Sequence, residues 1–176
     1  MNGSLIEKFW TDFCNNHGIS KSSHYEAYSF GDPESADYIA DLVKNGIKTA
    51  TSSALELYEE NERIPQVGDY NVILDSQNLP ICVTQTKVVE IVPFNQIMVE
   101  HAYHEGEGNR SYEYWHNAHV KFFNAEFKSA NKVFTDSSPN YIIIGGSLLF
   151  FICLVYIIYI IESVIKRKKV PRNRPR

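Results

Sequence analysis

Residues 46–52 place one lysine, Lys48, among hydroxyl side chains, directly after a sequence that ends a helix. A lysine in a partly buried pocket of low polarity can lose its proton near neutral pH, because burial disfavours the charged form. The neutral amine can then act as a base toward a neighbouring hydroxyl and turn it into a nucleophile. The alternative is structural, since a lysine at a helix end interacts with the helix dipole and threonines form strands.

Residues 104–111 form a second segment that could carry chemistry. They include two carboxylates, two glycines and an arginine, which is more than a connector requires. The alternative is a solvated loop in which Ser111 caps the helix that follows.

The histidines suggest a metal site only weakly. His101 with His104, and His116 with His119, have the spacing i, i+3 that places two side chains on one helical face. No further ligand has a suitable spacing, so we expect neither a metal nor another cofactor.

The charge of the chain is divided unevenly. The residues up to Asp136 include 10 Lys and Arg against 20 Asp and Glu, whereas those from Ser137 onward include 7 basic residues and one acidic residue. An acidic body argues against a clamp for duplex DNA, which needs a basic surface. It leaves room for a local pocket that binds one strand or one nucleoside.

Hydrophobic periodicity and turn residues predict the elements that must position these groups. The expected helices cover about residues 4–13, 33–44, 53–62, 95–104 and 111–127, and the expected strands about 47–52, 70–75 and 79–92. Strands framed by helices, with a β-hairpin at the centre, predict a small α+β domain built on a curled sheet.

Residues 141–161 form an apolar run of 21 residues without a charge, and basic residues follow it. About 20 apolar residues in a helix cross the hydrocarbon core of a bilayer. The sequence therefore predicts a folded domain over residues 1–136, a linker over 137–140, a single transmembrane helix over 141–161 that contacts the lipid bilayer, and a basic tail over 162–176. The alternative is a buried core helix or strand.

The orientation of this expected single-pass membrane protein stays open. The positive-inside rule keeps the basic tail in the cytoplasm and would place the body outside. The first residues contain no secretory signal, which favours a tail anchor with a cytoplasmic body.

Several separated segments together resemble the ASCH domain family, in order from about Leu5 to Thr135. They are residues 30–31, 46–51, 65–69, 93–94 and 105–111, followed by Trp115, His119 and residues 122–123. The family is similar to PUA domains, so the resemblance implies a small PUA-like β-barrel flanked by helices. Its members are associated with RNA: some hydrolyse the amide of an acetylated cytidine, some cut RNA, and others are thought only to bind it.

The resemblance also implies individual site residues. The family's lysine falls on Lys48, its hydroxyl residue on Thr51 and its glutamate on Glu105. In the amidohydrolase branch these act as a catalytic set, which implies Thr51 as nucleophile, Lys48 as its base and Glu105 as the group that holds or relays the proton. The substrate-binding candidates are Phe30, Thr49, Ser53, Glu107 and Arg110.

Two features depart from the family pattern. Ser53 stands where the amidohydrolase branch has an arginine, and residues 137–139 lead straight into the apolar run where the family has a closing strand. Either residues 141–144 double as that strand, or the barrel lacks it, or the tail results from a frameshift or fusion.

The sequence thus leaves three functions open. The leading one is a domain that acts on RNA or a modified nucleoside, as an amidohydrolase or a ribonuclease, through Lys48, Thr51 and Glu105. The first alternative is a non-catalytic RNA-binding module tethered to a membrane. The second is a membrane-tethered interaction protein whose pocket is inactive.

Overall fold

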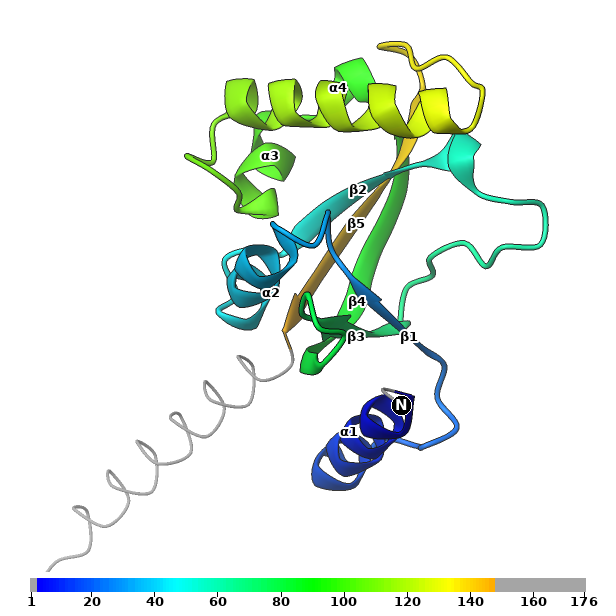
Figure 1. The fold of residues 1–176 in the computed structure, drawn as a ribbon, viewed down its shortest axis with the longest axis vertical. Coiled ribbons are helices and arrows are strands. Elements are labelled where there is room, and N and C mark those ends of the chain that lie inside the picture. The colour runs from blue at the N-terminus through cyan, green and yellow to red at the C-terminus, as the bar shows by residue number, and fades with distance from the viewer. Residues whose placement is uncertain (1–2, 148–176) are drawn as a thin grey trace, which may run out of the picture.

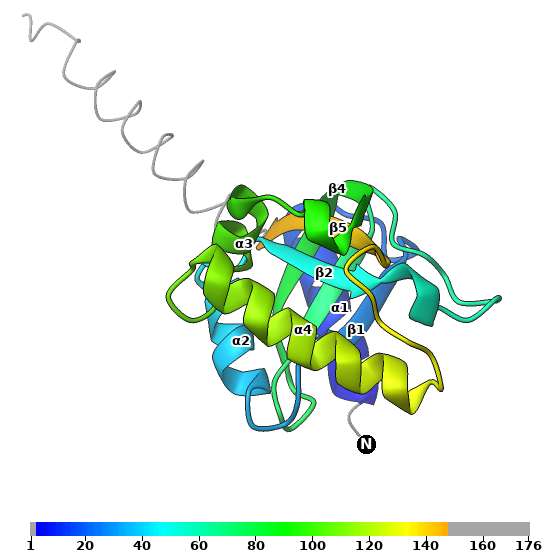
Figure 2. The same ribbon diagram turned by 90° about the horizontal axis from the view of Figure 1, so that it is seen from above.

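A computed structural model describes residues 3–147 of the chain (Figure 1). It has an α+β fold in which one five-stranded sheet carries helices on both of its faces (Figure 2). The predicted α+β class, with helices flanking a sheet, is therefore confirmed.

The strands are β1 (Tyr25–Ser29), β2 (Ala50–Ala54), β3 (Tyr70–Leu74), β4 (Pro80–Pro93) and β5 (Pro139–Ser147). They lie in the order β1-β3-β4-β5-β2. Only β1 and β3 pair in parallel, and the other neighbours are antiparallel. β1 and β2 are thus the two edges of the sheet, and β5 is an interior strand.

Two helices cover opposite faces of the β3–β4 hairpin. Helix α1 (Gly3–His17) packs Trp10 and Phe13 against Val72 and Val83. Helix α2 (Ala36–Lys44) packs Ala40 and Val43 against Ile73 and Cys82, the neighbouring residues of the same strands. Successive side chains of a strand point to opposite faces, so both faces of this hairpin are buried.

Helices α3 (Val99–Glu105) and α4 (Tyr112–Ser129) pack together at the β2 end of the molecule (Figure 1). Their core contains Ala54, Phe94, Ala102, Trp115 and Phe123. Ser111 caps α4 by accepting a hydrogen bond from the backbone N–H of Tyr114, as the sequence predicts. This cluster fixes α3, which carries Glu105, against strand β2.

Strand β5 corrects the prediction for the apolar run. Residues 141–147 do not begin a transmembrane helix, because they pair with β4 on one side and β2 on the other. An interior strand of a sheet can be as apolar as a membrane span, so composition alone does not distinguish the two. Residues 148–161 of the run and the basic tail 162–176 lie outside the described residues. Within residues 3–147, no helix combines the length and apolarity needed to cross a bilayer.

The helix expected over residues 53–62 is also wrong. Ser53 lies in β2, and only a single turn of 3-10 helix, Leu55–Leu57, follows it. Ser53, which the sequence places at the start of that helix, instead belongs to β2, which pairs along its length with β5.

Candidate functional site

The segment that carries Lys48 lies between α2 and α3. The backbone N–H of Lys48 donates to the carbonyl of Leu42 at 3.1 Å, and that of Thr49 donates to the carbonyl of His104 at 2.8 Å. Gly106 ends α3 in the left-handed conformation with φ +76°, and a Cβ built there would lie 2.7 Å from the carbonyl oxygen of Ile47. This close backbone approach requires a glycine and brings Glu105 against Lys48.

Lys48 is held by two carboxylates. Its Nζ donates to Glu105 Oε2 at 2.5 Å and to Glu107 Oε1 at 2.9 Å. The side chains of Lys48 and Glu105 are 3% and 2% exposed, whereas that of Glu107 is 26% exposed. The result is a buried group of one cation and two anions.

The pKa values of this pair follow from burial and charge together. Burial lowers the pKa of Lys48, but the charges of Glu105 and Glu107 outweigh it and hold the pKa above its ordinary value. Burial raises the pKa of Glu105, but Lys48 and hydrogen bonds from His101 and His119 bring it well below its ordinary value. Both groups are therefore charged at neutral pH.

The second carboxylate oxygen of Glu105, Oε1, is surrounded by further groups that the sequence did not assign to the site. Ser52 Oγ donates to it at 2.8 Å, His101 Nε2 at 3.0 Å and Trp115 Nε1 at 3.2 Å. His119 Nε2 lies 3.4 Å away. The sequence carried two signals for this network, namely the i, i+4 spacing of His101 and Glu105 on one helix and the family resemblance, which includes Trp115 and His119.

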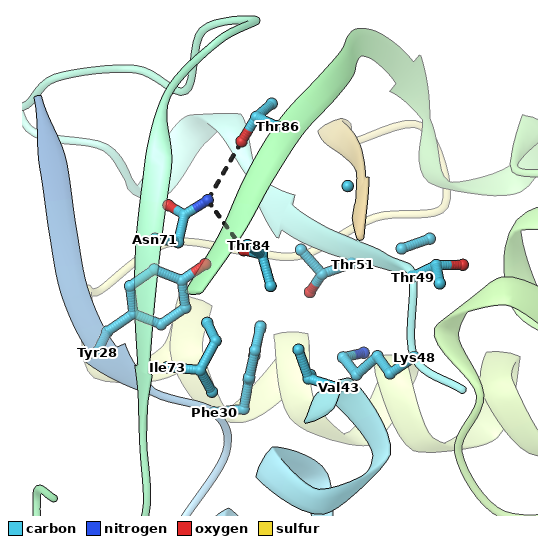
Figure 3. Close-up of a pocket in the computed structure, with 12 residues that line it drawn as sticks. Tyr28, Phe30, Val43, Lys48, Thr49, Thr51, Asn71, Ile73, Thr84 and Thr86 are labelled. Atoms are coloured by element: carbon cyan, nitrogen blue, oxygen red, sulfur yellow. Dashed lines mark hydrogen bonds between the residues drawn. The ribbon is translucent and has the colours of Figure 1, made fainter. Parts of the chain in front are cut away.

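Lys48 also lines a cavity on the other side, enclosed by the curled sheet (Figure 3). The empty space of the cavity is about 350 Å³ when its open mouth is included. All five strands contribute to its lining, through Tyr28, Thr51, Asn71, Ile73, Thr84, Thr86 and Gly145. Phe30, Val43, Lys48, Thr49 and Ala50 complete it.

Strand alternation separates Thr51 from Glu105. Thr51 faces the cavity with Lys48, while its neighbour Ser52 faces the opposite side and bonds to Glu105. Glu105 and Glu107 line a second, smaller cavity of about 190 Å³ beside α4. The structure thus brings Lys48 to both Thr51 and Glu105 but places Lys48 between the two cavities.

The Thr51 hydroxyl is available for chemistry. Within residues 3–147 its side chain has no hydrogen-bond partner, although it borders the cavity that Lys48 lines. Thr51 is half-buried, so its hydroxyl is open to a molecule that enters the cavity.

The remaining candidates lie in different places. Lys48 Nζ stands 5.3 Å from the centre of the Phe30 ring, inside the cavity. Thr49 lines the cavity edge and bonds to His104 at 3.1 Å. Ser53 bonds to the hydroxyl of Tyr58 at 2.9 Å and does not line the cavity.

Arg110 also lies away from the cavity lining. Its guanidinium is 5.2 Å from the centre of the Tyr103 ring, and its Nη1 donates to the Tyr103 hydroxyl at 3.3 Å. Arg110 therefore belongs to the surface of α3 and the loop that follows it.

The four histidines that were considered as metal ligands have other contacts. His101 and His119 bond around Glu105, His104 bonds to Thr49, and His116 lies beside Phe94 and Tyr112. Within the described part of the chain, no group of three or more His, Cys, Asp or Glu side chains is arranged to hold a metal ion.

Solved structures similar to this chain carry the same fold. A crystal structure of an ASCH domain from Lactobacillus crispatus is 26% identical, with a TM-score of 0.73 over 83% of this chain and 92% of that one. Protein EF3133 from Enterococcus faecalis is 30% identical, with a TM-score of 0.73 over 82% of this chain and 93% of that one. No curated protein matches the sequence closely enough to indicate a relationship.

The family model named ASCH domain matches residues 26–143, which run from the second residue of β1 into β5 and include Lys48, Thr51 and Glu105. The match thus includes residues of all five strands. This chain belongs to the ASCH domain family.

Proposed function

We propose that this ASCH domain removes an acyl group from the amide of a modified nucleoside, with Thr51 as nucleophile. The observation that carries the proposal is that the free hydroxyl of Thr51 and the fixed amine of Lys48 border one cavity. The family is generally associated with RNA, which makes a nucleoside of RNA the natural class of ligand.

Lys48 would move the proton in this reaction. Its ammonium must first pass a proton to Glu105 or Glu107, both within hydrogen-bond distance, and from there to solvent. The neutral amine then takes the proton of Thr51 while the hydroxyl oxygen attacks the amide carbonyl. The proton goes to the leaving amine of the base, and water releases the acyl group from Thr51.

The charge of the site favours an amide over a phosphodiester. One lysine faces two carboxylates, so the cluster carries a net negative charge with both pKa values shifted toward the charged forms. Nucleases stabilise a developing negative charge with surplus cations or metal ions. A neutral amide avoids the repulsion that a phosphate would meet here.

The test is incubation of the full-length chain with N4-acetylcytidine, with cytidine and acetate measured by chromatography and mass spectrometry. The wild type should release both products, and the Thr51→Ala variant should release neither. Thr51→Ser should retain activity because it keeps a hydroxyl. Thr11→Ala on α1, on the other side of the sheet, is the matched control for losing a threonine. Equal turnover by wild type and Thr51→Ala would refute the proposal.

A second candidate is a non-catalytic pocket that binds a nucleoside of RNA. The raised pKa of Lys48 favours it, because a lysine that stays protonated is a poor base and a good hydrogen-bond donor. Saturable binding of cytidine without release of acetate from acetylcytidine would support this function and exclude the hydrolase.

A further inference from the structure

The cavity has an unusually polar floor. Side chains inside a curled sheet are normally apolar and fill the space. Here Asn71, Thr84 and Thr86 from β3 and β4 face the cavity, and Thr86 is only 2% exposed (Figure 3). Burying polar groups costs free energy unless they are hydrogen-bonded, so their presence requires a reason.

Hydrogen bonds among these three residues leave some of their polar capacity unused. Asn71 Nδ2 donates to Thr84 Oγ1 at 3.4 Å and to Thr86 Oγ1 at 3.3 Å. Within residues 3–147, the Asn71 Oδ1 oxygen has no partner, and neither threonine hydroxyl donates to another group. An amide and two hydroxyls can together offer both donors and acceptors to another molecule.

We infer that Asn71, Thr84 and Thr86 form a specificity subsite that binds the polar edge of an uncharged pyrimidine base. This inference rests on the proposed function and names the part of the substrate that these strands would recognise. A pyrimidine edge alternates donors and acceptors, which matches a floor that offers both.

The walls of the cavity fit the faces of such a ring. Phe30, Val43 and Ile73 supply apolar surface beside the polar floor (Figure 3). Tyr28 lines the same cavity, and burial together with nearby acidic groups raises the pKa of its phenol, so it remains a neutral O–H donor. Aromatic and apolar walls with a few placed polar groups are typical of sites for small ligands.

Charge narrows the class of ligand further. Lys48 is its one cationic lining residue among those described, and Glu105 and Glu107 already neutralise that charge. The floor residues are uncharged, so the subsite selects a neutral base and not a phosphate.

The test measures binding of cytidine, adenosine and ribose 5-phosphate to the full-length chain by calorimetry or NMR titration. Cytidine should bind most tightly, and ribose 5-phosphate should not compete with it. Asn71→Leu and the nearly isosteric Thr86→Val should weaken cytidine binding by about 10-fold to 100-fold, because they leave polar atoms of the base unpaired. Thermal melts would verify that each variant is folded.

Gln85→Leu is the matched control. Gln85 lies between Thr84 and Thr86 on β4, but its side chain bonds to the carbonyl of Gly68 and does not line the cavity. Its variant should bind cytidine like the wild type. Equal cytidine affinity in the wild type, Asn71→Leu and Thr86→Val, or equal affinity for ribose 5-phosphate, would overturn the inference.

The same variants distinguish a failure of the proposed subsite from a failure of the proposed hydrolase activity. If the wild type releases acetate from acetylcytidine and Asn71→Leu does so with an unchanged KM, the subsite is wrong and the hydrolase stands. If no acetate is released but cytidine binding depends on Asn71 and Thr86, the hydrolase is wrong and the subsite stands. If both are right, Asn71→Leu raises the KM for acetylcytidine more than it lowers kcat.

Discussion

Lys48 and Glu105 are separated by 57 residues in the sequence, yet the lysine Nζ and the glutamate Oε2 lie 2.5 Å apart in the buried centre of the site. Lys8 and Asp12 on α1 form a pair at the same distance of 2.5 Å, but their side chains are 72% and 53% exposed. The two pairs have equal N–O distances and opposite environments, so a comparison of them tests the effect of burial on the strength of an ion pair.

Removing the charge of Glu105 should destabilise the protein strongly. Glu105→Gln leaves Lys48 buried with only the half-buried Glu107 as an anion, and breaking a buried ion pair costs about 3 kcal/mol. Urea unfolding of the full-length chain measures this change. Asp12→Asn should change the unfolding free energy by no more than about 1 kcal/mol, because exposed pairs contribute little. Equal effects of the two substitutions would show that the buried pair has no special role in stability.

The stability should fall at both ends of the pH range. Glu105 has a lowered pKa when folded, so its contribution is present above its unfolded value of 4.5 and is lost as the pH falls through the lower folded value. Lys48 has a raised pKa, so its contribution is present below its unfolded value of 10.5 and is lost as the pH rises through the higher folded value. Urea midpoints across the pH range measure both limbs. Glu105→Gln should flatten the acidic limb, and an unchanged acidic limb would assign it to other carboxylates.

The rate of acyl release should rise with pH if Lys48 is the base. The pKa of Lys48 lies above 10.5, so the fraction of neutral amine rises about tenfold for each pH unit below that value. A plot of log kcat/KM against pH should therefore rise with a slope near one between about pH 7 and pH 10, after subtraction of the enzyme-free rate. A flat profile would show that Lys48 acts as a cation, and would favour binding or orientation over proton transfer.

Gly106 should tolerate no side chain. Gly106→Ala combines a positive φ of +76° with contacts of 2.7 Å to Ile47 O and 2.9 Å to Lys48 N, so it should push Glu105 and Lys48 apart. Gly18→Ala is the control, since Gly18 has a similar φ of +66° but nothing within 4 Å of the added Cβ. The control should cost about 1 kcal/mol from backbone strain alone, and Gly106→Ala clearly more. Equal losses in unfolding free energy would mean that the loop shifts to accommodate the methyl group.

Local signals in the sequence predicted much of the fold. The hydrophobic faces of α1 and α4, the Ser111 cap and the β3–β4 hairpin depend on neighbouring residues, so periodicity and turn chemistry identify them. Strand β1 was missed because its burial pattern is mostly exposed, without the apolar alternation of a typical strand. The composition of β5 does not distinguish a buried strand from a membrane helix, and only its pairing with β2 and β4 decides.

The site could be predicted only in part, because it too depends on contacts between segments that are distant in the sequence. Family resemblance placed Lys48, Thr51 and Glu105 in one region, and the structure brings Lys48 within reach of Glu105. Spacing alone could not decide which of Thr51 and Ser52 faces the cavity, because that depends on the register of β2. Asn71 and Thr86 gave no signal, since a threonine-rich strand is ordinary in sequence and becomes notable only when it faces a cavity.

The position of β5 predicts where the chain can be shortened. A chain that ends at residue 136 loses the strand that lies between β4 and β2, so β2 is left without its strand partner and the cavity without Gly145. The loss of an interior strand is large against the about 5–15 kcal/mol by which native proteins are stable, so this chain should show no cooperative melting by circular dichroism. A chain that ends at Ser147 keeps all five strands and should melt cooperatively and bind cytidine. Cooperative melting of the shorter chain would show that β2 and β4 can close the sheet without β5, and failure of the longer one would show that residues beyond 147 contribute to the folded domain.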